Sequence, residues 1–162
     1  MARTGGLPGP ARALRSYSTR RLYPMPTFLT RRITFAAAHR YRRPEWLDAR
    51  NSEVFGLCAR ELFHGHTYVC TVTVTGDVDS TTGMVINLAE LDRVLGLEVR
   101  DRFDHRNINL EVPEFADGKR IPTGEELTRF IYDRVQSALG DSARVAEVTL
   151  AEDDTLSASF RP

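Results

Sequence analysis

The sequence is short of several residue types and patterns, and each shortage excludes a class of protein. It holds only two cysteines, Cys58 and Cys70, which excludes a disulfide scaffold and indicates free thiols in a reducing compartment. No apolar run approaches the roughly 20 residues that cross a bilayer. No short apolar segment follows a basic start, as it would in a secretory signal. We therefore expect a soluble protein without a membrane partner.

Acidic residues are absent from positions 1–44, which contain ten arginines. The rest of the chain carries 12 basic and 22 acidic residues, a charge of about −10, although the whole chain is formally neutral. Because this body is acidic, nucleic acid is not an expected partner. The length of 162 residues and the hydrophobic content of 41% indicate one domain with one core.

Residues 1–28 have no apolar period and contain several arginines, glycines and prolines. We expect a disordered, Arg-rich extension there, followed by a single domain over residues 29–162. Mitochondrial transit peptides have a similar composition, but the arginine bias of the whole chain, 21 arginines to one lysine, favours a plain tail and a cytoplasmic protein. Met1 and Met25 both remain candidates for the start of translation.

Two segments, residues 33–39 and 64–75, alternate with the period of a β-strand. The second is rich in β-branched residues, which favours a strand further. The side chains on the predicted inner face are Ile33, Phe35, Ala37 and His39 in the first segment, and His64, His66, Tyr68, Cys70, Val72 and Val74 in the second. Histidines therefore stand at one end of both inner rows.

Two helices and two further strands are predicted after these segments. Asn87 and Thr123 are typical helix N-caps, each followed three residues later by a glutamate and then by apolar residues at helical spacing. Gly140 is placed to end the second helix. Short strands are predicted near residues 145–150 and 156–160. The order ββααββ indicates an α+β fold rather than a parallel α/β fold.

Three of the four histidines have the spacing of a metal site. Residues i and i+2 of a strand point to the same side about 6.5 to 7 Å apart, so His64 and His66 can approach one ion, with Gly65 leaving room between them. His39 ends a neighbouring inner row and supplies a third imidazole. Three imidazoles leave the fourth tetrahedral position open, as in catalytic zinc sites. The alternative, hydrogen-bonded core histidines, stays open on periodicity alone.

Other candidate residues have both a chemical and a plain interpretation. Cys58 lies six residues before the HxH pair, where a nearby cation would lower the pKa of its thiol, but it also suits a small buried position. Asp104 can orient the adjacent His105, although sequence neighbours do not by geometry face one another. The plain interpretation of Thr123 is a helix cap, and that of Glu152 is an acid in a turn.

Seven segments, in order, resemble the 6-pyruvoyl-tetrahydropterin synthase family, which includes the 6-carboxy-tetrahydropterin synthases of deazaguanine biosynthesis. They are FAAAHR (35–40), FGLCARELFHGHTY (55–68), GDVDSTTGMVINLAEL (76–91), FDHRNIN (103–109), VPEF (112–115), PTGEEL (122–127) and the late Glu152. The resemblance implies a tunnelling fold (T-fold), a ββααββ antiparallel sheet with two helices packed on one face. It also implies a homo-oligomer, a trimer or hexamer, with active sites at subunit interfaces.

The resemblance further implies a reaction and a role for nine residues. The protein would be a zinc-dependent lyase that removes triphosphate from 7,8-dihydroneopterin triphosphate, in the tetrahydrobiopterin or queuosine pathway. The implied residues are the zinc ligands His39, His64 and His66, the catalytic thiol Cys58, the assisting pair Asp104 and His105, and the pterin-binding residues Thr123, Glu125 and Glu152. A carboxylate suits the pterin edge because it accepts two parallel hydrogen bonds.

The product and two alternative functions stay open. The six-residue step from Cys58 to His64 resembles the 6-pyruvoyl branch, whereas Gly124 in PTGE resembles the bacterial 6-carboxy branch. A non-catalytic zinc- or pterin-binding module of the same fold is one alternative, and the presence of Cys58, Asp104 and His105 argues against it. A dihydroneopterin aldolase or GTP cyclohydrolase relative is another, and the histidines with Cys58 argue against the metal-free aldolase.

Overall fold

The computed structural model describes residues 26–162. The expected extension over residues 1–28 and its targeting alternative thus fall almost wholly outside the described residues and stay predictions. Residues 27 and 28 already belong to the first strand. Within the described range, no helix is long and apolar enough to span a membrane.

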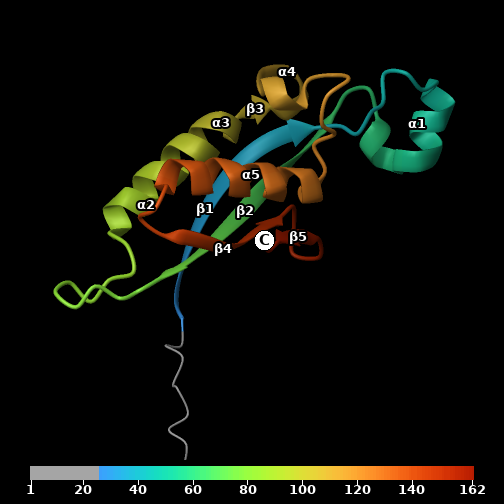
Figure 1. Cartoon of the computed structure of the whole chain (residues 1–162). Coiled ribbons are helices and arrows are strands. Elements are labelled where there is room, and N and C mark those ends of the chain that lie inside the picture. Colours follow the sequence, from blue (N-terminus) through green and yellow to red (C-terminus); the bar gives the residue numbers. More distant parts are fainter. Residues whose placement is uncertain (1–25) are drawn as a thin grey trace, which may run out of the picture.

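Five strands form one sheet in the order β3-β1-β2-β4-β5 (Figure 1). They are β1 (Thr27–His39), β2 (His64–Gly76), β3 (Arg106–Asn107), β4 (Arg144–Ala151) and β5 (Ser157–Phe160). The four strands expected from the sequence are all present. β1 begins well before the predicted start at Ile33. The sequence did not predict this first part because residues 27–32 are mostly exposed and show no apolar alternation.

The pairing of β1 with β2 sets the geometry of the histidines. The two strands are antiparallel over their whole length, from Thr27 opposite Gly76 to His39 opposite His64. β2 with β4 and β4 with β5 are also antiparallel. β3 pairs in parallel with β1, so the sheet is mixed rather than purely antiparallel. At two residues, β3 is too short to produce a sequence period.

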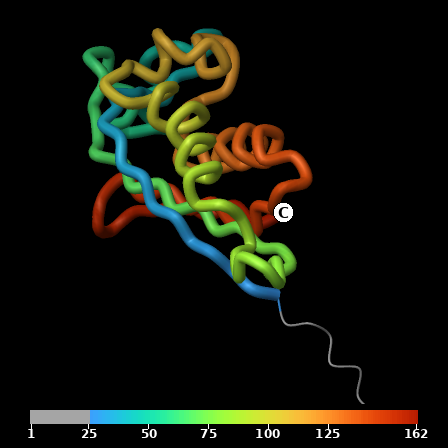
Figure 2. The backbone as a smooth tube through the Cα atoms, turned by 90° about the vertical axis from the view of Figure 1, so that its left-hand side faces the viewer, coloured from blue at the N-terminus to red at the C-terminus, as the bar shows by residue number. Residues whose placement is uncertain are grey.

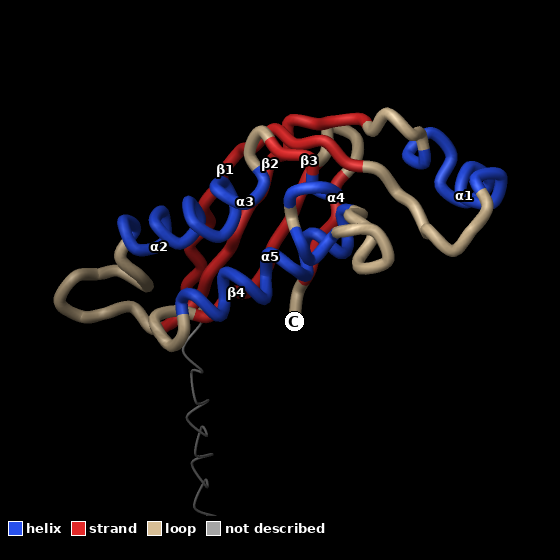
Figure 3. The backbone as a smooth tube through the Cα atoms, turned by 90° about the horizontal axis from the view of Figure 1, so that it is seen from above, coloured by secondary structure: helices blue, strands red, loops and turns tan. Residues whose placement is uncertain are grey.

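Helices cover one face of the sheet, as Figures 1 and 3 show. They are α2 (Leu88–Leu95), the π-helical η2 (Gly96–Arg100), α3 (Asp101–Phe103), α4 (Ile108–Glu111), the 3-10 helix η3 (Pro113–Phe115) and α5 (Gly124–Leu139). The first three follow one another without a break, and α5 lies beside them (Figure 2). This layering confirms the α+β class.

The expected helix ends are found at both main helices. The Asn87 side chain accepts a hydrogen bond from Ala89 N at 2.9 Å, and the Thr123 hydroxyl accepts one from Glu126 N at 3.3 Å. Gly140 follows α5 with φ 53°, a left-handed conformation that glycine adopts without strain. Residues close to each helix end were therefore sufficient to predict where α2 and α5 begin and where α5 ends.

The core lies between the helices and the inner face of β1 and β2. Phe35 of β1 stacks on Tyr68 of β2 and on Phe103 of α3, with ring centroids 4.9 and 5.3 Å apart. Phe130 of α5 meets Phe103 edge to face at 6.1 Å. The inner rows predicted from strand periodicity are buried except at His64 and His66, which are half-buried at the end of β2.

A helical arm between β1 and β2 was not expected from the sequence. It consists of α1 (Asp48–Phe55) and the 3-10 helix η1 (Gly56–Ala59), and it projects beyond the end of the sheet (Figures 1 and 3). The Asn51 side chain bonds to backbone atoms of Arg43 and Trp46, and Trp46 stacks on Phe55 at 5.8 Å. This arm places Cys58, within η1, near the end of β1.

Candidate functional site

Three histidine side chains meet where β1 and β2 pair at one end of the sheet. His39 and His64 are opposite one another in the ladder, and His66 follows on the same face of β2. Their ring centroids lie 4.5, 5.1 and 5.2 Å apart, and one nitrogen of each falls within 4.8 Å of the others. The predicted convergence of the three imidazoles is confirmed.

The chemistry of the three rings fits a divalent transition metal. His39 is fully buried, and its Nδ1 lies 2.9 Å from the carbonyl oxygen of Pro122, which can only accept, so Nδ1 carries the proton and Nε2 keeps its lone pair. Nδ1 of His64 and Nε2 of His66 are buried without a hydrogen-bond partner. Unpaired buried nitrogens on neutral rings are the donors that zinc sites use.

Burial favours the neutral form of His39 and of His64. It lowers the pKa of His39 to about 4 and also lowers the pKa of His64, with the neighbouring imidazoles adding to both shifts. Neutral imidazole is the metal-binding form. Gly65 contributes by its small size, since a Cβ there would lie 3.1 Å from the carbonyl oxygen of Ala37 and would push β1 and β2 apart.

Two tyrosines that the sequence analysis did not select surround the histidines. The hydroxyl of the fully buried Tyr68 lies 3.1 and 3.2 Å from the two ring nitrogens of His39. The ring of Tyr41 meets that of His39 edge to face, with centroids 5.2 Å apart. Tyr68 stands in the predicted inner row, so its place was available as a signal. Tyr41 lies beyond the strand, where periodicity ends.

A cavity of about 350 Å³ opens beside the histidines. It is lined by Tyr41, Val54, Phe55, Thr123, Gly124, Glu125, Leu150, Glu152, Leu156, Ser157 and Ala158. The three residues implied for pterin binding, Thr123, Glu125 and Glu152, are therefore brought to one wall, although their roles stay predictions. Val54 and Phe55 come from the α1 arm, which no sequence signal placed near the site.

Glu152 links the cavity to the histidine cluster. Its side chain is 6% exposed, with Oε2 at 3.6 Å from Nε2 of His66 and Oε1 at 3.4 Å from the hydroxyl of Tyr41. Burial raises the pKa of the Glu152 carboxyl, while His66 and the Tyr41 hydrogen bond oppose that shift. A buried carboxylate in a small cavity is suited to bind a ligand that presents N–H donors.

Cys58 is half-buried in η1. Burial and then Glu152 raise the pKa of its thiol, opposite to the lowered pKa expected beside a cation. The physical reason is that the protein groups around it are acidic or neutral, so only the charge of a bound metal would act in the lowering direction.

Asp104 and His105 face one another but not the cavity. Asp104 Oδ1 lies 3.1 Å from His105 Nδ1 and accepts a hydrogen bond from Ala36 N at 2.9 Å. His105 adopts φ 58°, which turns its ring back toward Asp104 and overcomes the expectation that sequence neighbours diverge. The His105 side chain is 84% exposed, and within residues 26–162 no contact joins it to the three histidines.

The chain is similar to named pterin synthases over the whole described fold. Residues 28–162 match the family model described as 6-pyruvoyl tetrahydropterin synthase. The chain is 39% identical over 134 residues to the 6-pyruvoyl tetrahydrobiopterin synthase of Drosophila melanogaster, covering 83% of this chain and 79% of the relative. It is also 39% identical to the Homo sapiens protein of that name over 111 residues, 68% and 75% of the two chains.

A bacterial relative and solved structures complete the comparison. The 6-carboxy-5,6,7,8-tetrahydropterin synthase of Bacillus subtilis is 31% identical over 115 residues, 68% of this chain and 74% of the relative. The Caenorhabditis elegans 6-pyruvoyl tetrahydropterin synthase structure superposes with a TM-score of 0.79 at 31% identity, covering 85% of this chain and 96% of that one. The Plasmodium vivax synthase, with a TM-score of 0.60 at 16% identity over 85% and 98%, supports the fold alone. The chain belongs to the 6-pyruvoyl tetrahydropterin synthase family.

Proposed function

We propose that this protein is a zinc-dependent lyase that eliminates triphosphate from 7,8-dihydroneopterin triphosphate and forms 6-pyruvoyl-tetrahydropterin. The observation that carries the proposal is the cluster of three converging imidazoles, one fully buried and two half-buried, beside a cavity that also presents the Glu152 carboxylate. The identities of 39% to the two 6-pyruvoyl relatives, against 31% to the 6-carboxy relative, support the 6-pyruvoyl product. The six-residue step from Cys58 to His64 agrees with this choice.

The cavity supplies the pterin site in this proposal. Glu152 would accept two parallel hydrogen bonds from the amino and ring N–H groups of the pterin edge. Phe55 and Leu150 provide apolar walls, and Thr123 and Glu125 stand at the start of α5 on the same wall. A volume of about 350 Å³ lies at the lower end of the range for small-molecule sites, which suits a bicyclic ring.

The histidines would hold zinc with one coordination position left for substrate. When bound, the ion would polarise the hydroxyl groups of the substrate side chain and so acidify the adjacent C–H bonds. Cys58 would help move a proton from the side-chain carbon next to the ring to the ring C=N bond, so that this carbinol is oxidised to a ketone while the dihydropterin ring is reduced. Removal of the proton on the next carbon and cleavage of the terminal C–O bond would release triphosphate with the bonding electron pair, and the enol left behind would become the second ketone. Asp104 and His105 would assist Cys58 from a neighbouring subunit.

The test joins metal content, turnover and product mass. Purified protein should contain about one zinc per subunit, release triphosphate from 7,8-dihydroneopterin triphosphate, and yield a product with the mass of 6-pyruvoyl-tetrahydropterin. Cys58→Ala should keep the zinc and lose at least about a hundredfold in kcat, in line with the usual contribution of a general base. Cys70→Ala, a buried thiol on β2, is the matched control and should keep its kcat.

Each outcome bears on a separate part of the proposal. Full turnover in Cys58→Ala removes the thiol from the mechanism. A product with the mass of the 6-carboxy compound overturns the choice of branch and keeps the enzyme class. Zinc and pterin binding without triphosphate release would instead favour the non-catalytic binding module.

A further inference from the structure

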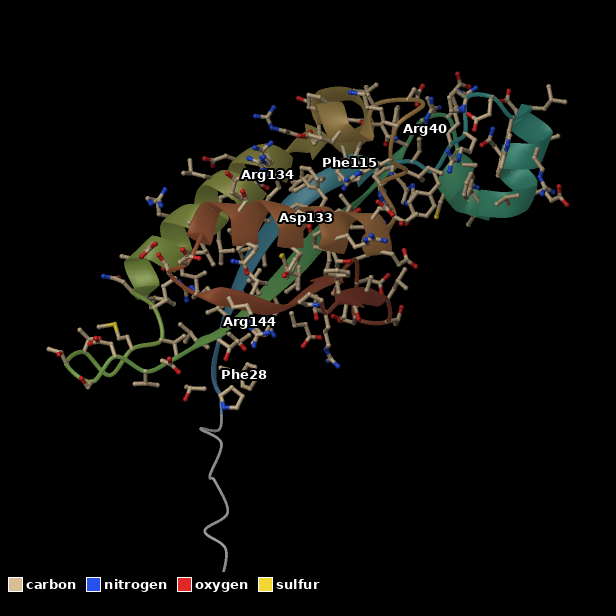
Figure 4. The ribbon with its side chains drawn as sticks, in the orientation of Figure 1. Phe28, Arg40, Phe115, Asp133, Arg134 and Arg144 are labelled. Atoms are coloured by element: carbon tan, nitrogen blue, oxygen red, sulfur yellow. The ribbon has the colours of Figure 1, made fainter. Side chains whose placement is uncertain are left out.

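Tyr41 contacts each of the three functional parts of the site. It lies two residues beyond His39, after Arg40, which Figure 4 labels at the end of the sheet near α1. Its backbone N donates to the carbonyl oxygen of Cys58 at 2.8 Å. Its ring packs on His39, and its hydroxyl lies 3.4 Å from Oε1 of Glu152. No residue role implied by the sequence includes it.

The hydroxyl of Tyr41 remains a donor at neutral pH. The ordinary pKa of a phenol is about 10, so the hydroxyl keeps its proton. In the described chain it is the one side chain that donates a hydrogen bond to the Glu152 carboxylate. Each carboxylate oxygen has two lone pairs, so Oε1 can accept from Tyr41 and still accept from a ligand.

The orientation of the Glu152 carboxylate decides whether it can bind a ligand edge with two hydrogen bonds. Rotation about the terminal torsion of a glutamate is broad, so an unrestrained carboxylate samples orientations that miss the paired geometry. A donor fixed at one oxygen reduces this freedom before the ligand arrives. The Tyr41 ring is itself restrained by Phe55, whose centroid lies 6.0 Å away, and by His39.

We propose that Tyr41 is a positioning residue for pterin recognition, whose hydroxyl holds the Glu152 carboxylate in the orientation that receives the pterin edge. This inference rests on the proposed pterin substrate. It assigns different roles to Tyr41 and Tyr68, because the hydroxyl of the fully buried Tyr68 faces His39 and therefore belongs to the metal side of the site. Loss of the Tyr41 hydroxyl should weaken pterin binding and leave metal binding intact.

The experiment measures binding of neopterin, a fluorescent pterin without triphosphate, to the zinc-loaded full chain. Tyr41→Phe should raise the Kd for neopterin about fivefold to tenfold, the usual net effect of losing one hydrogen bond. It should raise the KM for the triphosphate substrate with little change in kcat, since the ground state and the transition state lose the same contact. Zinc content should equal that of the wild type.

Matched variants identify the route of the effect. Tyr132→Phe removes a hydroxyl from a ring that packs on Phe160, away from the cavity, and should leave the Kd unchanged. In a Glu152→Gln background, adding Tyr41→Phe should change the Kd by less than about twofold, because the partner of the hydroxyl has lost its charge.

Failure of this inference is distinguishable from failure of the proposed function. An equal loss of affinity on adding Tyr41→Phe in both backgrounds, or wild-type affinity in the single variant, overturns the positioning role. Neopterin binding by a wild-type protein that releases no triphosphate overturns the proposed reaction only. A wild-type protein that does not bind neopterin overturns both.

Discussion

At the scale of single residues, the environment of each histidine determines its protonation state. His39 has no exposed surface, and its one carbonyl partner, Pro122 O, fixes the tautomer. An imidazole in this position cannot be charged without losing hydration that the protein does not replace. The same burial that prepares His39 to bind a metal therefore makes the metal-free protein sensitive to acid.

This sensitivity gives a pH prediction for metal-free protein. The pKa of His39 is about 4 when folded, against an ordinary value of 6.5, so between these values the unfolded chain binds more protons. The free energy of unfolding should therefore fall as the pH drops from about 6.5 towards 4, by on the order of 3 kcal/mol from this group. Urea titrations at several pH values, after chelator treatment, measure it.

His39→Gln isolates the contribution of this residue, because glutamine has no proton to gain. The variant should show a flatter dependence on pH over that window than the wild type, whatever its absolute stability. Parallel curves for the two proteins would show that His39 does not titrate as the structure indicates.

At the scale of elements, helix α5 has two roles that can be separated experimentally. Thr123 caps its first turn and also lines the cavity, whereas Asn87 caps α2 and is not among the residues that line this cavity. Gly124 follows the cap closely packed, since a Cβ there would lie 3.2 Å from Cβ of Ala158 and 3.8 Å from Oε1 of Glu152. The start of α5 is thus part of the cavity wall.

A pair of cap variants tests this division. Thr123→Ala and Asn87→Ala should each lower the free energy of unfolding by about 1 kcal/mol, the usual value of an N-cap hydrogen bond. Only Thr123→Ala should also raise the KM for the pterin substrate. Thermal or urea unfolding together with steady-state kinetics measures both effects, and an unchanged KM in Thr123→Ala would exclude its hydroxyl from the binding wall.

At the scale of the whole molecule, the sheet has open edges, and the Asp104–His105 pair does not line the cavity. β3 covers β1 only at Ala37 and Ala38, and β5 pairs with β4 alone among the described strands. Open strand edges pair readily with further strands. Asp104 and His105 are turned away from the cavity of their own subunit, so we propose that a second copy brings its own pair to Cys58.

Subunit mixing tests this assembly. Light scattering should give the mass of a trimer or hexamer for the wild type. Cys58→Ala and His105→Asn should each be nearly inactive alone, and co-expressed subunits should recover part of the activity, because some interfaces then combine an intact thiol with an intact histidine. Mixed oligomers without recovered activity would place the complete catalytic set within one subunit.

Local rules accounted for most of the fold and for part of the site. Strand periodicity predicted the inner rows that carry His39, His64 and His66, and cap residues predicted where α2 and α5 begin. The α1 arm was not predicted because its short helix has only one buried residue, Asn51, and therefore no apolar period. The hydroxyl contacts of Tyr41 and Tyr68 join residues far apart in the chain, so no local pattern marks them.

The sequence by itself determined which side chains share a strand face and where the main helices start, because these depend on period and on neighbours within a few residues. Only the tertiary structure decided that Glu152, Tyr41 and the start of α5 enclose one cavity beside the histidines, and that Asp104 and His105 face away from it. These relations depend on how separate elements pack and on which polar side chains that packing buries next to one another. Such packing is a property of the whole fold and is not encoded at any one position.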